Sequence, residues 1–260
     1  DAIHSNELWK SDGTEAGTML LKDINPGTKG SSPKNLMNID DTLFFTASDG
    51  VHGEELWKSD GTEAGTTMVK DIVLGADYHS IIQLLNVKGT LFFLKYDGGP
   101  ETFELWKSDG TEIGTVKVDD LNSGYHRLNA LTFGNYGYYL ISDTLYKVNN
   151  DGQPKVLDFS GQEILFIDMT VVGGKIVLSA IVTNADDSSG YLQLWTTDGT
   201  SEGTELIKDF SDTIKATYYD YFSIKTFPID SNKVRLEIYT DWDEKVNLVT
   251  DGTSEGTVVW

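Results

Sequence analysis

The stretch that decides the fold is ELWKSDGTEAGT at Glu7–Thr18. Its recognisable copies start at Glu7, Glu55, Glu104, Gln193 and Val246. A sixth, degenerate copy includes Leu145, and successive copies lie close to fifty residues apart. Self-similarity at such a period is the sequence signature of a repeat architecture, so the repeat has to be interpreted before any single motif.

Each repeat contains short apolar runs separated by turn residues. In residues 33–72 the runs KNLMNI, TLFFTA, EELWKS and TTMVKDI are separated by DD, SDGVHG and DGTEAG. Runs of this composition bounded by Gly and Asp are typical of strands, and no stretch shows a sustained helical period. Four antiparallel strands are the unit of a β-propeller blade, so the sequence predicts an all-β propeller without a helix.

Adjacent apolar residues within the predicted strands support blades. Examples are Leu43-Phe44-Phe45, Leu56-Trp57 and Leu91-Phe92-Phe93. Because neighbours on a strand point to opposite faces, both faces of each sheet must be covered. A blade between two other blades meets this requirement, whereas a two-sheet sandwich leaves one face of each sheet polar. A β-solenoid is the alternative, although fifty residues with four strands is long for one coil.

The predicted domain is a single β-propeller over residues 1–260 with five complete blades and a two-stranded half blade, which makes six repeats. The complete blades are 33–72, 80–121, 127–158, 163–210 and 220–260. The half blade, 1–24, holds only the last two strands of a blade. Either about twenty upstream residues, enough for two strands and their turns, complete it, or it pairs with something else. An unpaired strand edge is a template for another chain.

The DGTEAGT segment between the third and fourth strands is typical of turn chemistry. Asp12 can accept a hydrogen bond from the N–H two residues on, and Gly13 and Gly17 can take positive φ. The predicted structural turn residues of the five copies are Asp12, Gly13, Gly17, Asp60, Gly61, Gly65, Asp109, Gly110, Gly114, Asp198, Gly199, Gly203, Asp251, Gly252 and Gly256. The alternative is a Ca²⁺ site, but calcium needs several converging oxygens and five separate corners cannot converge. We therefore predict no cofactor, with Ca²⁺ as the alternative.

Composition excludes several classes of function. The chain carries 41 acidic and 20 basic residues, a formal net charge of -21, which argues against a nucleic-acid partner. It has no cysteine, so disulfides, thiolate metal sites and cysteine nucleophiles are absent. No apolar run approaches the roughly 18 residues needed to span a bilayer.

The fourth repeat, LYKVNNDGQPKVLDF, has Tyr146 in place of Trp and lacks the second Gly-Thr pair. One blade can therefore lose the motif, which indicates that no function needs every copy.

The string ELWKSDGTEAGT followed by VKDI resembles the ELWxxDGT repeat family of bacterial secreted and surface proteins, which are sometimes described as hyalin-like. Three copies match closely, two match in the DGT half and one is degenerate. The resemblance implies an exported, propeller-like protein, and it implies no activity and no catalytic residue.

The remaining candidates for chemistry are histidines and carboxylates. The histidines are His4, His52, His79 and His126. His4 and His52 precede third strands and are interpreted as loop residues. A serine near His79 or His126 in the sequence does not make a catalytic triad. An aspartate recurs at the ends of the fourth strands, at Asp23, Asp71, Asp120, Asp158 and Asp209. We interpret it as a strand-end cap, with a carboxylate ring holding a cation as the alternative. NADDSS at 184–189 is interpreted as a solvated loop, with a metal site as the alternative.

The sequence thus predicts a non-catalytic interaction or structural module, secreted or at the cell surface, with no catalytic residue. The expected partners are another surface protein, a glycan or a copy of itself, in a homo-oligomer or fibre, with no membrane span. The alternative is a polysaccharide-active enzyme, a glycoside hydrolase or lyase, with its cleft at the mouth of the propeller channel. That alternative needs non-repeated aromatic and acidic residues in the deviant repeats, such as Tyr218, Tyr219, Tyr221 and Trp242.

Overall fold

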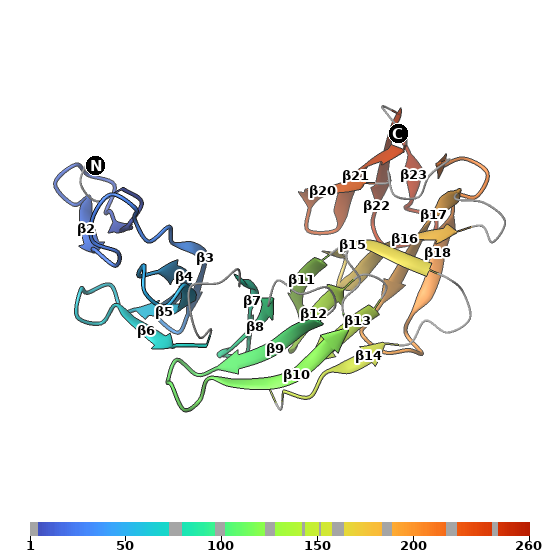
Figure 1. The fold of residues 1–260 in the computed structure, drawn as a ribbon. Coiled ribbons are helices and arrows are strands. Elements are labelled where there is room, and N and C mark those ends of the chain that lie inside the picture. Colours follow the sequence, from blue (N-terminus) through green and yellow to red (C-terminus); the bar gives the residue numbers. More distant parts are fainter. Residues whose placement is uncertain are drawn as a thin grey trace. The chain divides into compact units, whose positions relative to one another are not determined.

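The structure, a computed structural model, is all β (Figure 1). It describes residues 5–72, 80–96, 102–122, 128–141, 144–150, 152–157, 164–183, 189–216, 223–240 and 244–260. These ranges contain strands and turns and no helix, so the predicted fold class is confirmed. No helix long and apolar enough to cross a bilayer occurs in this described part of the chain.

Within the described residues, six antiparallel sheets follow one another along the chain, and the first of them contains two strands. That half blade is β1 (Leu8–Lys10) and β2 (Met19–Lys22). The second sheet is β3 (Lys34–Ile39), β4 (Thr42–Ser48), β5 (Glu54–Ser59) and β6 (Thr67–Lys70). The third is β7 (Ser80–Val87), β8 (Thr90–Tyr96), β9 (Thr102–Ser108) and β10 (Val116–Asn122). In each sheet the spatial order follows the chain.

The last three sheets repeat the same meander. The fourth is β11 (Leu128–Phe133), β12 (Tyr136–Ile141), β13 (Thr144–Val148) and β14 (Lys155–Leu157). The fifth is β15 (Ile164–Val172), β16 (Lys175–Thr183), β17 (Gly190–Thr197) and β18 (Glu205–Asp209). The sixth is β20 (Ser223–Asp230), β21 (Lys233–Thr240), β22 (Glu244–Thr250) and β23 (Val258–Val259). A short strand that the sequence did not predict, β19 (Lys215–Ala216), adds to the fifth sheet beside β17.

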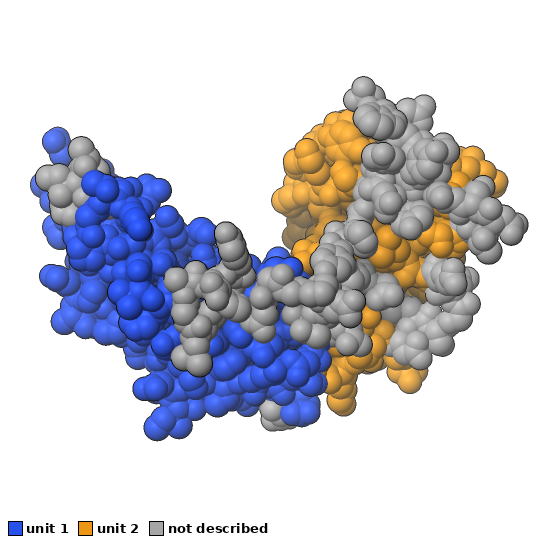
Figure 2. Space-filling model, viewed as in Figure 1, with its two compact units in different colours: residues 1–123, 149–153 blue, residues 124–148, 154–260 orange. Residues whose placement is uncertain are grey.

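The chain divides into two compact units, coloured separately in Figure 2. One contains residues 1–123 and 149–153, and therefore β1 to β10. The other contains residues 124–148 and 154–260, and therefore β11 to β23. The single domain over residues 1–260 stays a prediction.

Within each unit, consecutive sheets pack face to face. In the first unit Leu8 and Leu21 of the half blade share a buried cluster with Phe45 and Trp57 of the next sheet. A second cluster joins residues of β4 and β5 to residues of β7 and β8. In the second unit, two clusters join the fourth sheet to the fifth and the fifth to the sixth. In the second blade, Phe44 and Leu56 are therefore buried on one face and Phe45 and Trp57 on the other, as predicted.

The Leu-Trp pair of the motif lies in a third strand with a recurring irregularity. The register with the neighbouring fourth strand shifts between Leu56 and Trp57, and likewise between Leu8 and Trp9 in the half blade. Such a bulge increases the local twist of the strand. On the other edge, Trp57 lies opposite Phe45 of the second strand, with ring centroids 6.5 Å apart. The third strand of this blade thus pairs with a neighbouring strand on each of its two edges.

Candidate functional site

The DGT corner is a closed network of short hydrogen bonds. At the second copy, Asp60 Oδ1 accepts the backbone N–H of Thr62 at 2.9 Å and its hydroxyl at 2.7 Å. The same hydroxyl oxygen accepts the N–H of Gly65 at 3.0 Å. Thr66 donates its hydroxyl to the carbonyl of Thr62 at 2.7 Å, and its Oγ1 lies 2.7 Å from Ser59 Oγ. Equivalent Asx-turn bonds form at Asp12, Asp109, Asp198 and Asp251.

The two glycines of the corner have different roles, which corrects one sequence prediction. The first glycine takes positive φ in every copy, at Gly13, Gly61, Gly110, Gly199 and Gly252. The second does not, so the positive φ predicted for Gly17 is wrong. A Cβ on Gly17 would instead lie 2.0 Å from Asp12 Oδ1. The same obstruction, at 2.0 to 2.2 Å, occurs at Gly65, Gly114, Gly203 and Gly256. The second glycine is required because the aspartate carboxylate fills the space of a side chain.

The corner also explains the charge state of its aspartate. At Asp60 the hydroxyl of Thr62, and next its backbone N–H, lower the carboxyl pKa below 3.8. The same two causes lower the carboxyl pKa at Asp12, Asp109, Asp198 and Asp251. Each carboxylate is therefore used inside its own turn. The described residues contain no group of three or more His, Asp or Glu side chains placed to hold a metal ion.

Lysines of the motif connect one blade to the corner of the next. Lys10 donates to the carbonyl of Gly61 at 3.0 Å, and Lys58 donates to that of Gly110 at 2.7 Å. In the second unit, Lys147 reaches the carbonyl of Gly199 at 2.7 Å. The sequence analysis did not predict these bonds between blades. A lysine occurs at this position in four of the six repeats, and that recurrence could have indicated them.

We predict that Lys58→Met lowers the free energy of unfolding by about 1.5–3 kcal/mol, the contribution of a hydrogen bond from a charged donor. Methionine keeps most of the apolar stem but cannot donate to the buried Gly110. Urea denaturation measures the loss. The matched control is Lys34→Met, because Lys34 is largely exposed and pairs with Glu54 at 3.0 Å, so its change should stay within about 0.5 kcal/mol. Equal losses in both variants would contradict the inter-blade function.

The glutamate that begins ELW binds the backbone that follows the fourth strand. Glu7 is 7% exposed. Its Oε2 accepts the N–H of Ile24 at 2.9 Å and the hydroxyl of Ser31 at 2.5 Å, and its Oε1 accepts the N–H of Asn25 at 3.2 Å. The side chain thereby fixes the connection from the half blade to the next blade, a function that sequence reasoning also missed.

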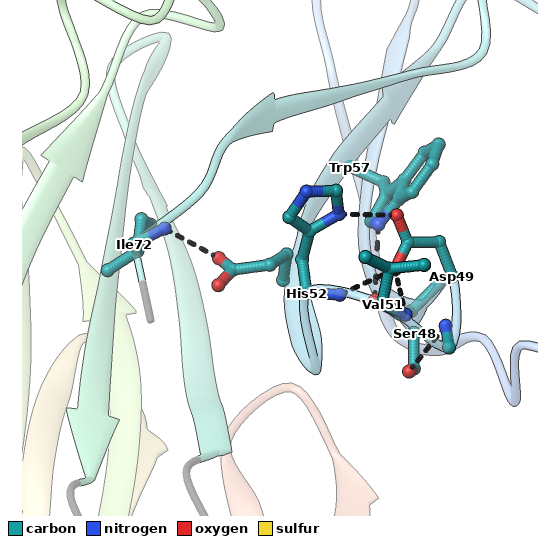
Figure 3. A network of polar contacts seen from close by, with 9 residues as sticks. Ser48, Asp49, Val51, His52, Trp57 and Ile72 are labelled. Carbon is teal, nitrogen blue, oxygen red and sulfur yellow. Dashed lines mark hydrogen bonds and ion pairs between the residues drawn. The ribbon is translucent and has the colours of Figure 1, made fainter. Parts of the chain in front are cut away.

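Other copies keep this contact or replace it. Glu55 Oε2 accepts the N–H of Ile72 at 2.9 Å (Figure 3). In the fifth repeat Gln193 stands at this position, donates to Asp209 at 2.9 Å and accepts the indole N–H of Trp195 at 3.0 Å. The polar residue before Leu-Trp is thus a structural anchor of the strand end.

His52 bonds within its own loop, as Figure 3 shows. Its ring Nδ1 lies 2.6 Å from Asp49 Oδ2, and its backbone N–H donates to Asp49 Oδ1 at 2.9 Å. The hydrogen bond to Asp49, followed by its charge, raises the pKa of His52 above 6.5. Partial burial opposes ionisation of Asp49, but hydrogen bonds from His52 and Val51 outweigh it and lower its pKa. The other histidines, His4, His79 and His126, lie outside the described residues.

The His52–Asp49 pair predicts a pH dependence. The contribution of His52 to the free energy of unfolding is complete below pH 6.5, and it is lost as pH rises through the raised pKa of His52. The contribution of Asp49 to the free energy of unfolding is present above pH 3.8, and it is lost as pH falls through the lowered pKa of Asp49. NMR titration of the His52 ring should give a pKa above 6.5, and Asp49→Asn should return it toward that value. An unchanged titration in the variant would contradict the pairing.

Two of the recurring aspartates near the ends of the fourth strands make local contacts, whereas Asp23 Oδ1 is buried without a hydrogen-bond partner among the described residues. Asp209 Oδ1 accepts the N–H of Ser211 at 2.7 Å, as a strand-end cap does. Asp120 pairs with Lys117 at 2.6 Å. Asp158 lies outside the described residues, as do most of the NADDSS segment and the enzyme candidates Tyr218, Tyr219, Tyr221 and Trp242.

A groove lies along the half blade. It has a volume of ≈ 650 Å³. Its lining comes from two segments of the first unit, one running into β1 and one leading into β3: Ser5, Asn6, Glu7, Leu8, Trp9, Ser32, Pro33, Lys34 and Leu36. Trp9 is 40% exposed, whereas its repeat counterpart Trp57 is 7% exposed. Trp57 is covered by the second strand of its blade.

Comparison with known proteins supports the fold. No family model and no curated protein matches the chain. Among solved structures, it is similar to a puromycin hydrolase, with a TM-score of 0.53, 12% identity, and coverage of 95% of this chain and 40% of that one. It is also similar to a puromycin-hydrolyzing peptidase from Mycobacterium tuberculosis (TM-score 0.54, 13% identity, coverage 89% and 38%).

A third similar structure is an oligogalacturonate lyase in complex with manganese, with a TM-score of 0.51, 9% identity and coverage of 84% of this chain and 61% of that one. The chain thus spans less than two thirds of the length of each of these proteins. At such identities the likeness shows the β-propeller fold alone.

Proposed function

We propose that the chain is a non-catalytic interaction module of a secreted or cell-surface bacterial protein of the ELWxxDGT repeat family. One observation carries the proposal: the recurring aspartate of the motif is bound within its own turn, and the recurring lysine is bound to the corner of the next blade. The repeated polar residues support a structural interpretation of the motif, because they bond within and between blades.

The proposed partners are another surface protein, a copy of the chain or a glycan. The net charge of -21 disfavours nucleic acid. Self-association through the half blade is tested by sedimentation over a hundredfold range of concentration. Growth of the particle with concentration is the expected result for a self-associating module. A strictly monomeric particle with ends verified by mass spectrometry would contradict self-association.

The alternative function is a polysaccharide-active enzyme. The fold likeness to an oligogalacturonate lyase is the observation that favours it. A screen of pectins and other polysaccharides for hydrolysis and for lyase products, run beside a glycan array, separates the two functions. We expect no turnover on any substrate, with or without added Mn²⁺ or Ca²⁺. Release of products from any glycan would overturn the non-catalytic proposal.

A further inference from the structure

In the described part of the chain, every Asp-Gly pair follows a serine or a threonine whose hydroxyl binds the glycine nitrogen. At the second corner the N–H of Gly61 donates to Ser59 Oγ at 3.1 Å. The same bond, at 2.9 to 3.2 Å, joins five other glycines to the hydroxyl two residues before them: Gly13, Gly50, Gly110, Gly199 and Gly252. Of the six hydroxyls, four belong to serine and two to threonine. The shared feature is therefore the hydroxyl oxygen rather than one residue type.

An Asp-Gly pair is chemically labile, because glycine has no side chain that shields its nitrogen. The nitrogen attacks the side-chain carboxyl carbon of the aspartate, and a C–N bond forms. The amide proton and the carboxyl hydroxyl leave together as water, which closes a five-membered succinimide ring. Water then opens the ring at either carbonyl and gives aspartate or isoaspartate. The reaction needs no oxidant, reductant or cofactor, and its rate depends on how often nitrogen and carbon reach an attack geometry.

The corner opposes this reaction at both reacting groups. The nitrogen of Gly61 is bonded to Ser59, whereas the carboxylate of Asp60 is bonded to the N–H and hydroxyl of Thr62 at 2.9 and 2.7 Å. The carboxylate also fills the space beside Gly65, where a Cβ would lie 2.1 Å from its Oδ1. The bonds from Thr62 lower the carboxyl pKa of Asp60 below 3.8, so the protonated form that loses its hydroxyl is scarce at neutral pH.

We propose that the hydroxyl before each of these Asp-Gly pairs protects the main chain against isoaspartate formation, and that its removal turns the aspartate into a modification site. Ser59 acts through the nitrogen of Gly61 and is therefore a positioning residue. Protection is needed because isoaspartate adds one carbon to the main chain of a turn between two strands, and the register of a hairpin is fixed by its turn. The inference goes beyond the proposed function, since it concerns the chemical lifetime of the corner and not a partner.

The test incubates the whole chain at neutral pH and at a warm temperature below its unfolding transition. Digestion and electron-transfer fragmentation then measure isoaspartate at each Asp-Gly pair, and the same chain unfolded in urea gives the unprotected rate of each pair. We expect the folded chain to react at least about tenfold more slowly at the six pairs, because a hydrogen bond must break before attack. Ser59→Ala should restore most of the lost rate at Asp60 and leave the rate at Asp109 unchanged.

Thr66→Val is the matched control. Thr66 Oγ1 lies 2.7 Å from Ser59 Oγ, so this variant removes a hydroxyl from the same network and leaves the acceptor of Gly61 in place. Urea denaturation of each variant shows whether the rate at Asp60 follows the stability of the corner or the presence of the acceptor. Ser59→Thr, which introduces the residue found in the fifth and sixth copies, should keep the protection.

Three results would overturn the proposal. One is an unchanged rate at Asp60 in Ser59→Ala, another is an equal rise in Ser59→Ala and Thr66→Val, and the third is a folded chain that reacts as fast as the chain in urea. Ser11→Ala repeats the test at a corner whose hydroxyl is exposed, and Asp12 is then the aspartate expected to react. This second variant decides the matter where Ser59→Ala fails to fold.

Discussion

Gly65→Ala is expected to lower the free energy of unfolding by about 2–3 kcal/mol, an overpacking penalty in a place that cannot relax. A Cβ at this position would lie 2.1 Å from Asp60 Oδ1. The carboxylate cannot move aside without losing the N–H and hydroxyl of Thr62, which hold it at 2.9 and 2.7 Å. Urea denaturation with an unchanged m-value measures the effect.

Gly61→Ala is the matched control, because it tests backbone conformation without a clash. Gly61 has φ +85°, and a Cβ added to it would meet nothing within 4 Å. Its cost is the left-handed strain of an alanine, about 1 kcal/mol. The structure thus predicts that the second glycine matters more than the first. A larger loss for Gly61→Ala than for Gly65→Ala would contradict this order.

A double-mutant cycle identifies the atoms responsible. Asp60→Ala removes the carboxylate that a Cβ at residue 65 would meet, so Gly65→Ala should cost little in that background. The two positions should therefore show strong coupling, as residues in contact do. Additive losses would mean that the glycine is required for another reason.

The corners show how far sequence reasoning reaches. Asp-Gly-Thr predicts an Asx-turn because the acceptor lies two residues from its donor, and the first glycine follows from the same local geometry. The prediction for the second glycine was wrong, because a position can require glycine for either of two reasons. The backbone may need positive φ, or a Cβ may clash with a neighbouring atom, and the sequence does not distinguish these reasons. Only the placement of the Asp60 carboxylate shows that space is the reason.

Contacts between repeats were harder to predict than the strands. The strand pattern is periodic and local, and it predicted the half blade and the five complete blades. The partner of Lys58 is a backbone carbonyl of Gly110, 52 positions away, and no residue type marks a carbonyl acceptor. Exposure was also not predictable from the motif. Trp9 and Trp57 lie in the same ELWKSDGTEAGT string, yet Trp9 is 40% exposed and Trp57 is 7% exposed.

Glu7→Ala is expected to lower the stability of the half blade by about 2–4 kcal/mol, because it leaves buried donors without their acceptor. The donors are the N–H groups of Ile24 and Asn25 and the hydroxyl of Ser31. The loss should be local, since these residues join the half blade to the next blade. Hydrogen exchange should therefore rise in residues 7–10 and 19–22 while exchange in the second unit stays unchanged.

Two further variants separate the hydrogen bonds of Glu7 from its charge. Glu7→Gln keeps one acceptor oxygen and should lose less than Glu7→Ala, as the glutamine at the equivalent position of the fifth repeat indicates. Glu15→Ala removes an exposed carboxylate of the same unit and should change little, because the bond from the N–H of Thr18 goes to the backbone carbonyl of Glu15, which alanine keeps. Equal losses for Glu7→Gln and Glu7→Ala would mean that charge dominates.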